Sequence, residues 1–334
     1  MRIATYNVEW FDSLFDNKGR LMLDDRWSSR RDITRVQQAE ALGIVFTAMD
    51  ADAIMVIEAP DTSSRRSTTR ALTHFAEAFD LRTTAVVTGF ANDTQQEIAL
   101  LYDPAVLSVR HDPQSSEAAP RFDAAFEIDL DIDATMDRVQ FSKPPLELAV
   151  TTAAGKTLRL IGAHLKSKAP HGARSRTEIM RFSIANRRKQ LAQAIWLRRR
   201  IETHLAAGES LMLLGDLNDG PGLDEFEHLF GRSSVEIILG DGGPHLYDPH
   251  AEEALARRIG AQPSTARFYI DKQKRYLSAL LDYIMVSDDL RVHNAPLWRI
   301  WHPFDDPRCW KIPELRDALL TASDHFPVTV DLDL

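Results

Sequence analysis

The chain has 334 residues, of which 44% are hydrophobic and 27% charged, so it is typical of a globular protein that buries a substantial core. Its formal net charge of −9 argues against a protein that coats nucleic acid through a basic surface. The single cysteine, Cys309, excludes an intramolecular disulfide and any zinc site built from four cysteines.

The chain opens with a strand-like segment, and residues 1–10 lack the apolar stretch of a signal peptide. No apolar run reaches the roughly 18 residues that a membrane span needs. We therefore expect a cytoplasmic protein without a membrane span. No feature of the sequence indicates an obligate protein partner.

Strand and helix patterns alternate over the first ninety residues. Residues 3–10 and 53–57 are expected to form strands, and apolar residues recur with helical spacing over 42–49 and 72–79. Further strands are expected at residues 81–90, 97–102, 122–130, 146–152 and 158–165, with a hairpin at Gly155 before the last. A long helix over 176–206 follows, and strands at 211–214, 280–287 and 328–334 close the chain. This order predicts an α+β fold with mixed sheets covered by helices, in one domain over residues 1–334.

Polar residues interrupt the apolar strands at their ends. Four strands end at such groups: Asn7, Glu58, His164, and Asp216 with Asn218. Two other strands begin with them, at Asp282 and at Asp324-His325. If these two strands run antiparallel to the others, all of these side chains meet at one edge of the sheets. Carboxylates gathered in this way repel one another unless a cation lies among them.

The chemistry of this set points to a hard cation. Oxygen ligands dominate and thiolates are absent, which favours Mg²⁺ or Mn²⁺ over zinc. The remaining acids and imidazoles are then free to transfer protons. Hydrolysis of a phosphate ester uses such a set, because it needs charge neutralisation, a base for water and donors to the phosphoryl oxygens.

Six short motifs in this order resemble the endonuclease/exonuclease/phosphatase superfamily, which has the DNase I-like fold. They are T-Y-N-V-E-W, I-E-A, H-L-K-S, G-D-L-N-D, L-D-Y-I-M-V-S and S-D-H-F-P-V, and they extend from Thr5 to Val328. The resemblance implies a four-layered α/β sandwich, in which two mixed β-sheets pack face to face between outer helices. It also implies a divalent-metal-dependent phosphodiesterase, foremost a nuclease acting on DNA or RNA by in-line attack of water.

The resemblance further implies a role for each residue. Glu58 is expected to be the principal metal ligand, with Asp324 contributing through a water. Asn7 is expected either to lie beside the metal or to position the phosphate. His325, oriented by Asp282, and His164 are expected to contact the phosphate, Asn218 to donate to a phosphoryl oxygen, and Glu97 to be the carboxylate partner of His164. The base is either Asp216 or the Asp282–His325 pair. For Glu97, an exposed glutamate at a strand edge is an alternative.

A basic segment follows the first of these histidines. Between His164 and His204 the chain carries eleven Lys and Arg residues against two Glu. Such a run is usually a solvated helix face. Because it begins directly after His164, we expect Lys166, Arg174 and Arg176 to bind an anionic substrate.

Two alternatives to a nuclease stay open at this point. One is a phosphatase or phosphodiesterase acting on a small molecule or a lipid head group, and the other is a non-catalytic binding scaffold with the same fold. Trp298, Trp301, Phe304 and Trp310 cluster late in the chain. They either pack in the core or stack on a base or sugar of a ligand.

Overall fold

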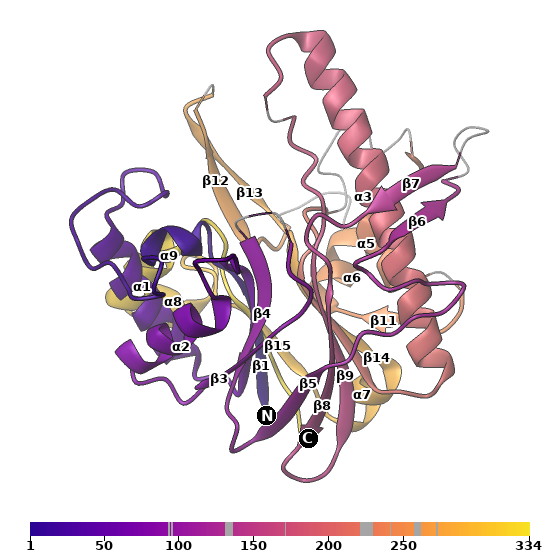
Figure 1. Ribbon diagram of the computed structural model, residues 1–334, viewed down its shortest axis with the longest axis horizontal. Coiled ribbons are helices and arrows are strands. Elements are labelled where there is room, and N and C mark those ends of the chain that lie inside the picture. Colours follow the sequence, from indigo (N-terminus) through magenta and orange to yellow (C-terminus); the bar gives the residue numbers. More distant parts are fainter. Residues whose placement is uncertain are drawn as a thin grey trace.

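The computed structural model describes residues 1–92, 94, 96–130, 136–170, 172–220, 230–240, 242–256, 262–271 and 273–334. Two mixed six-stranded sheets dominate it (Figure 1). The first sheet has the order β15 (Leu297–Ile300), β16 (Val328–Asp331), β1 (Arg2–Asn7), β2 (Ala53–Pro60), β4 (Gln96–Tyr102) and β3 (Ala85–Thr88). The second has the order β11 (Leu246–Tyr247), β14 (Asp282–Ser287), β10 (Leu211–Asp216), β9 (Thr157–His164), β8 (Leu146–Thr152) and β5 (Leu107–His111).

Two small two-stranded sheets and the helices complete the described fold. The small sheets are β6 (Ala125–Ile128) with β7 (Asp137–Gln140), and β12 (Ala266–Ile270) with β13 (Arg275–Ala279). The helices are η1 (Phe11–Leu14), α1 (Arg35–Met49), α2 (Thr68–Ala78), α3 (Arg176–Ala206), α5 (Ser234–Leu239), α6 (Pro249–Ala256), α7 (Asp288–His293), α8 (Pro307–Trp310) and α9 (Pro313–Ala322).

The alternation of apolar side chains along the strands produces four layers. In β1, Ala4 and Tyr6 pack with the layer that contains α1, α2 and α9, whereas Ile3 faces the second sheet. In β10, Leu211 and Leu213 pack against α3 and α5, whereas Met212 and Leu214 face the first sheet. Successive residues of a strand point to opposite faces, so each sheet is buried on both sides. The predicted four-layered sandwich with two mixed sheets is confirmed.

Several expected elements are also confirmed. Helix α3 covers the predicted residues 176–206 and begins with a capping box between Ser175 and Glu178. Strands β8 and β9 form the antiparallel hairpin expected around Gly155. Strand β14 runs antiparallel to β10, and β16 runs antiparallel to β1. These two orientations are the condition under which the polar strand ends meet at one edge.

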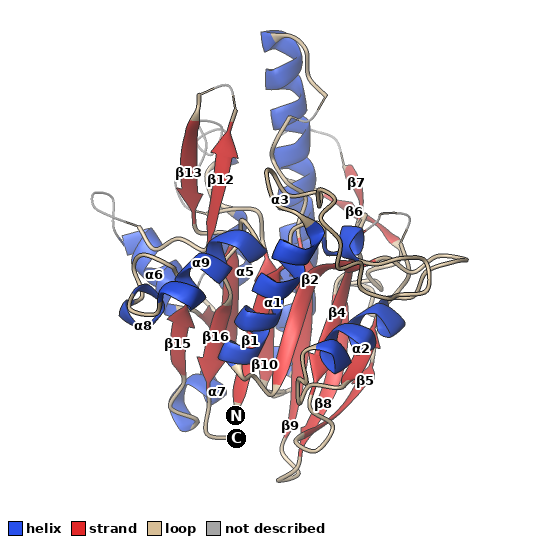
Figure 2. Cartoon of the chain, turned by 90° about the vertical axis from the view of Figure 1, so that its left-hand side faces the viewer, coloured by secondary structure: helices blue, strands red, loops and turns tan. Residues whose placement is uncertain are grey.

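Some elements were not predicted from the sequence. They are β5, β7, β11, β15, the hairpin β12–β13, and the short helices other than α1 and α2. The sequence does contain a pattern that predicts this hairpin, because Ala266, Phe268 and Ile270 alternate with polar or amphipathic residues and a run of polar residues follows. In Figure 2 the hairpin and the first turns of α3 project beyond the same edge of the sheets. Among the described residues, none of the helices combines the length and the apolar character that crossing a membrane requires.

Gly215 shapes the end of β10 immediately before Asp216. Its φ is +137°, and a Cβ atom there would lie 2.0 Å from the carbonyl oxygen of Ala163 on the neighbouring strand β9. Because that oxygen belongs to a buried strand, it cannot move aside without breaking the pairing of the two strands. We expect Gly215→Ala to lower the free energy of unfolding by about 3 kcal/mol, measured by urea denaturation.

Gly155 provides a matched control for this prediction. It also has a positive φ, +81°, but a Cβ atom there would meet nothing within 4 Å. Gly155→Ala therefore carries only the conformational cost, about 1 kcal/mol. Equal losses for the two variants would contradict the proposed clash with β9.

Candidate active site

Three of the expected residues form one row across the second sheet. Asp216 on β10 lies directly opposite His164 on β9 and opposite Asp282 on β14. Each of these residues continues the alternate positions of its strand whose side chains face the first sheet. In β10 those positions are Met212 and Leu214. Residues in register on neighbouring strands point to the same face, so all three side chains face the first sheet.

Asn7 meets this row from the opposite sheet. It lies at the end of β1, and its Nδ2 atom donates a hydrogen bond of 2.9 Å to Asp216 Oδ2. Asn218 donates to the same carboxylate, from its backbone N to Oδ1 at 2.7 Å and from Nδ2 to Oδ2 at 3.1 Å. The two amides therefore fix the Asp216 carboxylate between the two sheets.

Glu58 reaches the site through an irregularity in β2. The register between β2 and β4 shifts between Ile57 and Ala59, so Glu58 is the extra residue of a bulge. Its φ is +62°, a left-handed conformation that costs a non-glycine residue roughly 1–2 kcal/mol. In return, the bulge turns the carboxylate toward the site, where Oε2 accepts a hydrogen bond of 3.2 Å from the backbone N of Trp10.

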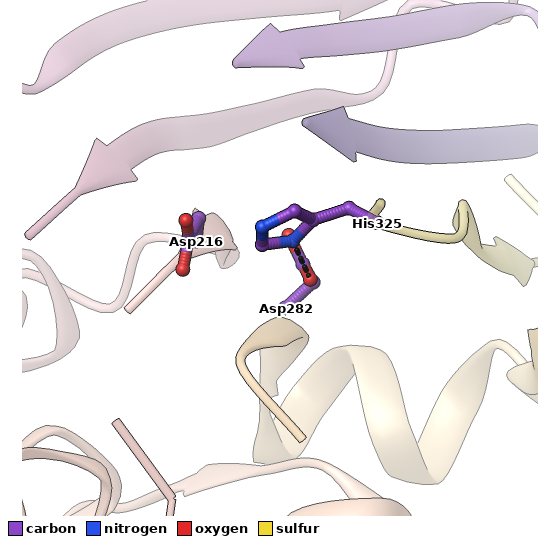
Figure 3. A group of neighbouring side chains, drawn as sticks. All are labelled: Asp216, Asp282 and His325. Carbon is purple, nitrogen blue, oxygen red and sulfur yellow. Dashed lines mark hydrogen bonds and ion pairs between the residues drawn. The ribbon is translucent and has the colours of Figure 1, made fainter. Parts of the chain in front are cut away.

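His325 and Asp282 form a hydrogen-bonded pair, drawn in Figure 3. His325 Nδ1 donates to Asp282 Oδ2 at 2.7 Å, and Thr265 Oγ1 donates to the same oxygen at 2.8 Å. Burial alone would lower the pKa of His325, but the carboxylates of Asp282, Asp216 and Asp324 raise it well above its usual value. The three carboxylates therefore favour the charged form of this buried imidazole.

These groups line one cavity of about 1040 Å³ at the edge of the sandwich. Eight of the twelve predicted site residues line it: Asn7, Glu58, His164, Lys166, Asp216, Asn218, Asp324 and His325. Asp282 lies behind His325. Glu97 is buried and does not line the cavity. Arg174 is exposed just before α3, and Arg176 is exposed as the first residue of α3. Of the late aromatic residues, Trp301 is buried, whereas Phe304 and Trp310 are exposed.

The partner of His164 differs from the one expected. His164 Nδ1 lies 3.1 Å from Lys143 Nζ, whereas the carboxylate of Glu97 accepts hydrogen bonds from Asn92 and Thr62. No hydrogen bond joins Glu97 to His164 within the described part of the chain. Lys143 was missed because it lies in the loop between β7 and β8, where no local sequence pattern marks it. A lysine ammonium can only donate, so His164 Nδ1 accepts and its proton lies on Nε2.

Burial keeps His164 uncharged. Desolvation, and then the positive charges of Lys143 and His325, lower the pKa of His164 well below its usual value. Its Nε2 atom lies 3.6 Å from Asp216 Oδ2. Burial and the charge of Asp282 raise the pKa of Asp216, and burial also raises that of Glu58. The site therefore contains carboxylates whose charged form is disfavoured by burial. Beside them lie His164, for which the neutral form is favoured, and His325, for which the charged form is favoured.

The donor set fits a divalent cation. Asn7 Oδ1 and Asp324 Oδ1 are buried, and neither has a hydrogen-bond partner among the described residues. Orphaned buried oxygens are costly unless a ligand satisfies them. With the Glu58 carboxylate, they provide hard oxygen ligands of the kind that Mg²⁺ and Mn²⁺ prefer. Atoms of Asp216, Asp282 and His325 also converge within 4.8 Å, but two of these residues already bond each other.

The interaction of Lys143 with His164 makes a testable prediction. We expect Lys143→Met, which keeps the length of the side chain, to release the tautomer of His164, because Nδ1 loses its donor. In ¹⁵N spectra of the imidazole, the Nδ1 resonance should change. Lys189→Met is the control, because Lys189 Nζ donates to Ser142 of the same loop at 3.3 Å. A spectrum of His164 unaltered by Lys143→Met would contradict the prediction.

Three of the cations after His164 line the cavity, namely Lys166, Lys168 and Arg187. Lys168 and Arg187 also form ion pairs with the buried Asp219, at 2.6 and 2.9 Å. Arg174 and Arg176 do not line the cavity. Of the three predicted substrate-binding residues, Lys166 alone therefore lies where the acids and histidines converge, and the binding role of all three stays a prediction.

The four-layered sandwich and this edge site define the DNase I-like class of folds. The model of the Endonuclease/Exonuclease/phosphatase family matches residues 4–325, so the chain belongs to that family, whose members are phosphoric ester hydrolases. No curated protein is significantly similar to this sequence.

Solved structures share the fold at low sequence identity. TDP2 from Caenorhabditis elegans is similar with a TM-score of 0.53 and 13% identity, over 100% of this chain and 75% of that one. TDP2 from D. rerio, complexed with a single strand DNA product, gives 0.51 and 12% over 100% and 99% of the two chains. The endonuclease/exonuclease/phosphatase from Bacteroides vulgatus gives 0.50 and 13% over 100% and 98%.

Proposed function

We propose that this protein is a divalent-metal-dependent phosphodiesterase, and that it acts as a nuclease on DNA or RNA. The observation that carries the proposal is the row of His164, Asp216 and Asp282, in which His164 and Asp216 line one cavity together with Asn7 from the opposite sheet. The similar fold of a TDP2 that was solved with a single strand DNA product supports nucleic acid as the substrate. We further propose that residues 1–334 act as one catalytic domain.

In this proposal Asp216 accepts the proton of the attacking water. Its carboxylate is held by Asn7 and Asn218 and faces the cavity. A bond forms between the water oxygen and phosphorus, the bond from phosphorus to the leaving oxygen breaks, and the leaving oxygen takes up a proton. His164 Nε2–H, the amide of Asn218 and the His325 imidazolium stabilise the charge on the phosphoryl oxygens. Asp282 positions His325.

Glu58, Asn7 and Asp324 would hold the cation. When bound, Mg²⁺ or Mn²⁺ neutralises phosphoryl charge and lowers the pKa of coordinated water. Lys166 would bind a substrate phosphate at the cavity, and Arg174 and Arg176 would contact an anionic substrate outside it. Glu97 would support the site through the loop that it binds at Asn92 and Thr62.

A substrate panel tests this function. Metal-stripped protein would be assayed with Mg²⁺, with Mn²⁺ and with a chelator against duplex DNA, single-stranded DNA, RNA, abasic DNA, bis(4-nitrophenyl) phosphate and a phosphomonoester. We expect cleavage of a nucleic acid that requires the metal. Cleavage confined to the phosphomonoester would reject the nuclease, and no turnover of any substrate by the folded protein would reject the hydrolase.

A further inference from the structure

Trp10 is an exposed aromatic residue at the wall of the active-site cavity. It lies between β1 and η1, and 41% of its surface is exposed. It lines the cavity together with Glu58 and Asp324. Its backbone N donates to Glu58 Oε2 at 3.2 Å, so the residue is attached directly to the expected metal ligand.

The backbone of Trp10 adopts a conformation that suits glycine. Its φ and ψ are 54° and 41°, in the left-handed region where a bulky side chain is strained. The backbone has a clear role there. Its N–H binds Glu58, and its carbonyl oxygen accepts hydrogen bonds from the N and Oγ atoms of Ser13 at 3.0 and 2.8 Å. A glycine would make all three bonds without strain, so these contacts do not explain the indole ring.

Trp10 lacks the aromatic and cationic contacts that most of the other tryptophans make. Among the described residues, no aromatic ring and no Lys or Arg side chain stacks on Trp10 or on the exposed Trp27, whereas Trp196, Trp298, Trp301 and Trp310 each have such a partner. The preceding residue is held firmly, because Glu9 pairs with Arg30 and its carbonyl accepts from Gln38 Nε2. The chain therefore fixes at the cavity wall a tryptophan that has no stacking partner among the described residues.

We propose that Trp10 is a stacking subsite for a nucleobase of the substrate. The proposal rests on the proposed function, because it places a phosphate ester beside Glu58. Of the parts of a nucleotide, which are the phosphate, the sugar and the base, only the base is planar and apolar enough to cover an indole. A base stacked on Trp10 fixes the neighbouring phosphate relative to Glu58 and Asp216. Because every base has a π face, this subsite selects for the presence of a base and not for its identity.

The experiment compares two ligands that differ by the base alone. Binding of adenosine 5′-monophosphate and of ribose 5-phosphate would be measured by calorimetry in a buffer containing Mg²⁺, for the wild type, Trp10→Phe and Trp10→Gly. Stacking of one base predicts that the wild type binds the nucleotide roughly 5- to 100-fold more tightly than the sugar phosphate. Trp10→Phe should keep most of this ratio. Trp10→Gly should reduce the ratio to about one by weakening the nucleotide alone.

Thermal unfolding tests for a purely structural role. Trp10→Gly relieves the left-handed strain but removes a side chain that is only 41% exposed, and because these effects oppose each other we expect its Tm without ligand to change by no more than roughly 4 °C. A nucleotide-to-sugar ratio that stays at the wild-type value in Trp10→Gly would overturn the stacking subsite. A wild type that binds both ligands equally would also overturn it, while leaving the phosphate-ester site intact. Failure of the wild type to bind either ligand would overturn the proposed function together with the subsite.

Discussion

Asp216→Asn is expected to lower metal-dependent phosphodiester turnover by about 10²–10⁴-fold, the range for removal of a positioned proton acceptor. Asparagine matches the shape of the side chain but cannot take a proton from water. The variant should nevertheless fold, because the Oδ1 atom of the new amide can still accept from the backbone N of Asn218. The NH₂ group of that amide takes the place of Oδ2, so Asn7 Nδ2 and Asn218 Nδ2 lose this acceptor, and the Asn7 amide must turn to bring its Oδ1 against the new group.

The stability of this variant should fall by no more than about 1–3 kcal/mol, because the buried donors on Asp216 Oδ2 lose their acceptor. Asp216 is 1% exposed, and burial together with the charge of Asp282 raises its pKa. Removing a carboxylate whose charge the folded state disfavours therefore offsets part of the loss of hydrogen bonds. Initial rates with Mn²⁺ and thermal unfolding on the same samples check both parts. A variant that keeps a tenth or more of wild-type turnover would exclude Asp216 as the proton acceptor.

Asp248→Asn is the matched control. Asp248 is fully buried, like Asp216, but lies outside the cavity. Its Oδ1 accepts from the backbone N atoms of His250 and Ala251 at the start of α6, and its Oδ2 accepts from Ile284 N of β14. An amide accepts through one oxygen only, so one buried N–H loses its acceptor and the free energy of unfolding falls by about 1–3 kcal/mol. Turnover per folded molecule should not change.

The sequence could predict the polar row because both of its causes are local. Apolar runs mark strands that are buried on both faces, and a polar residue at the end of such a run lies at the edge of the sheet. The expected meeting of these residues was conditional on antiparallel directions for the last two strands, and β14 and β16 have those directions, which brings Asp282 into register with Asp216. The architecture followed from the order of strands and helices.

The missed features depend on contacts between distant segments. Lys143 approaches His164 because the loop between β7 and β8 folds over the site, and the sequence around Lys143 carries no sign of that contact. The left-handed conformations of Trp10 and Glu58 are equally hidden, because neither residue type favours them. Local preference fails where a tertiary contact imposes strain, and both residues lie at the cavity wall.

Glu58→Gly is expected to raise the stability of the metal-free protein and to lower turnover. Glycine adopts the φ of +62° without strain, so metal-free protein should gain up to roughly 1 kcal/mol in its free energy of unfolding. Turnover should fall by at least about 10²-fold, because the site loses its carboxylate ligand. The stabilisation by metal should also disappear. A cation at 100 times its Kd stabilises a folded protein by about 2.7 kcal/mol, and this increment is absent when the site no longer binds it.

Ala295→Gly distinguishes relief of strain from loss of the ligand. Ala295 is exposed, has a φ of 42°, and lies outside the active-site cavity. Its replacement should give a similar gain of stability without metal, while the rise of Tm on adding Mn²⁺ and the turnover stay at wild-type values. A Glu58→Gly protein that still gains the full increment from Mn²⁺ would show that the cation binds elsewhere. Asn7 Oδ1 and Asp324 Oδ1 would then need another explanation for their lack of partners, since a cation held by Glu58 is what would satisfy both.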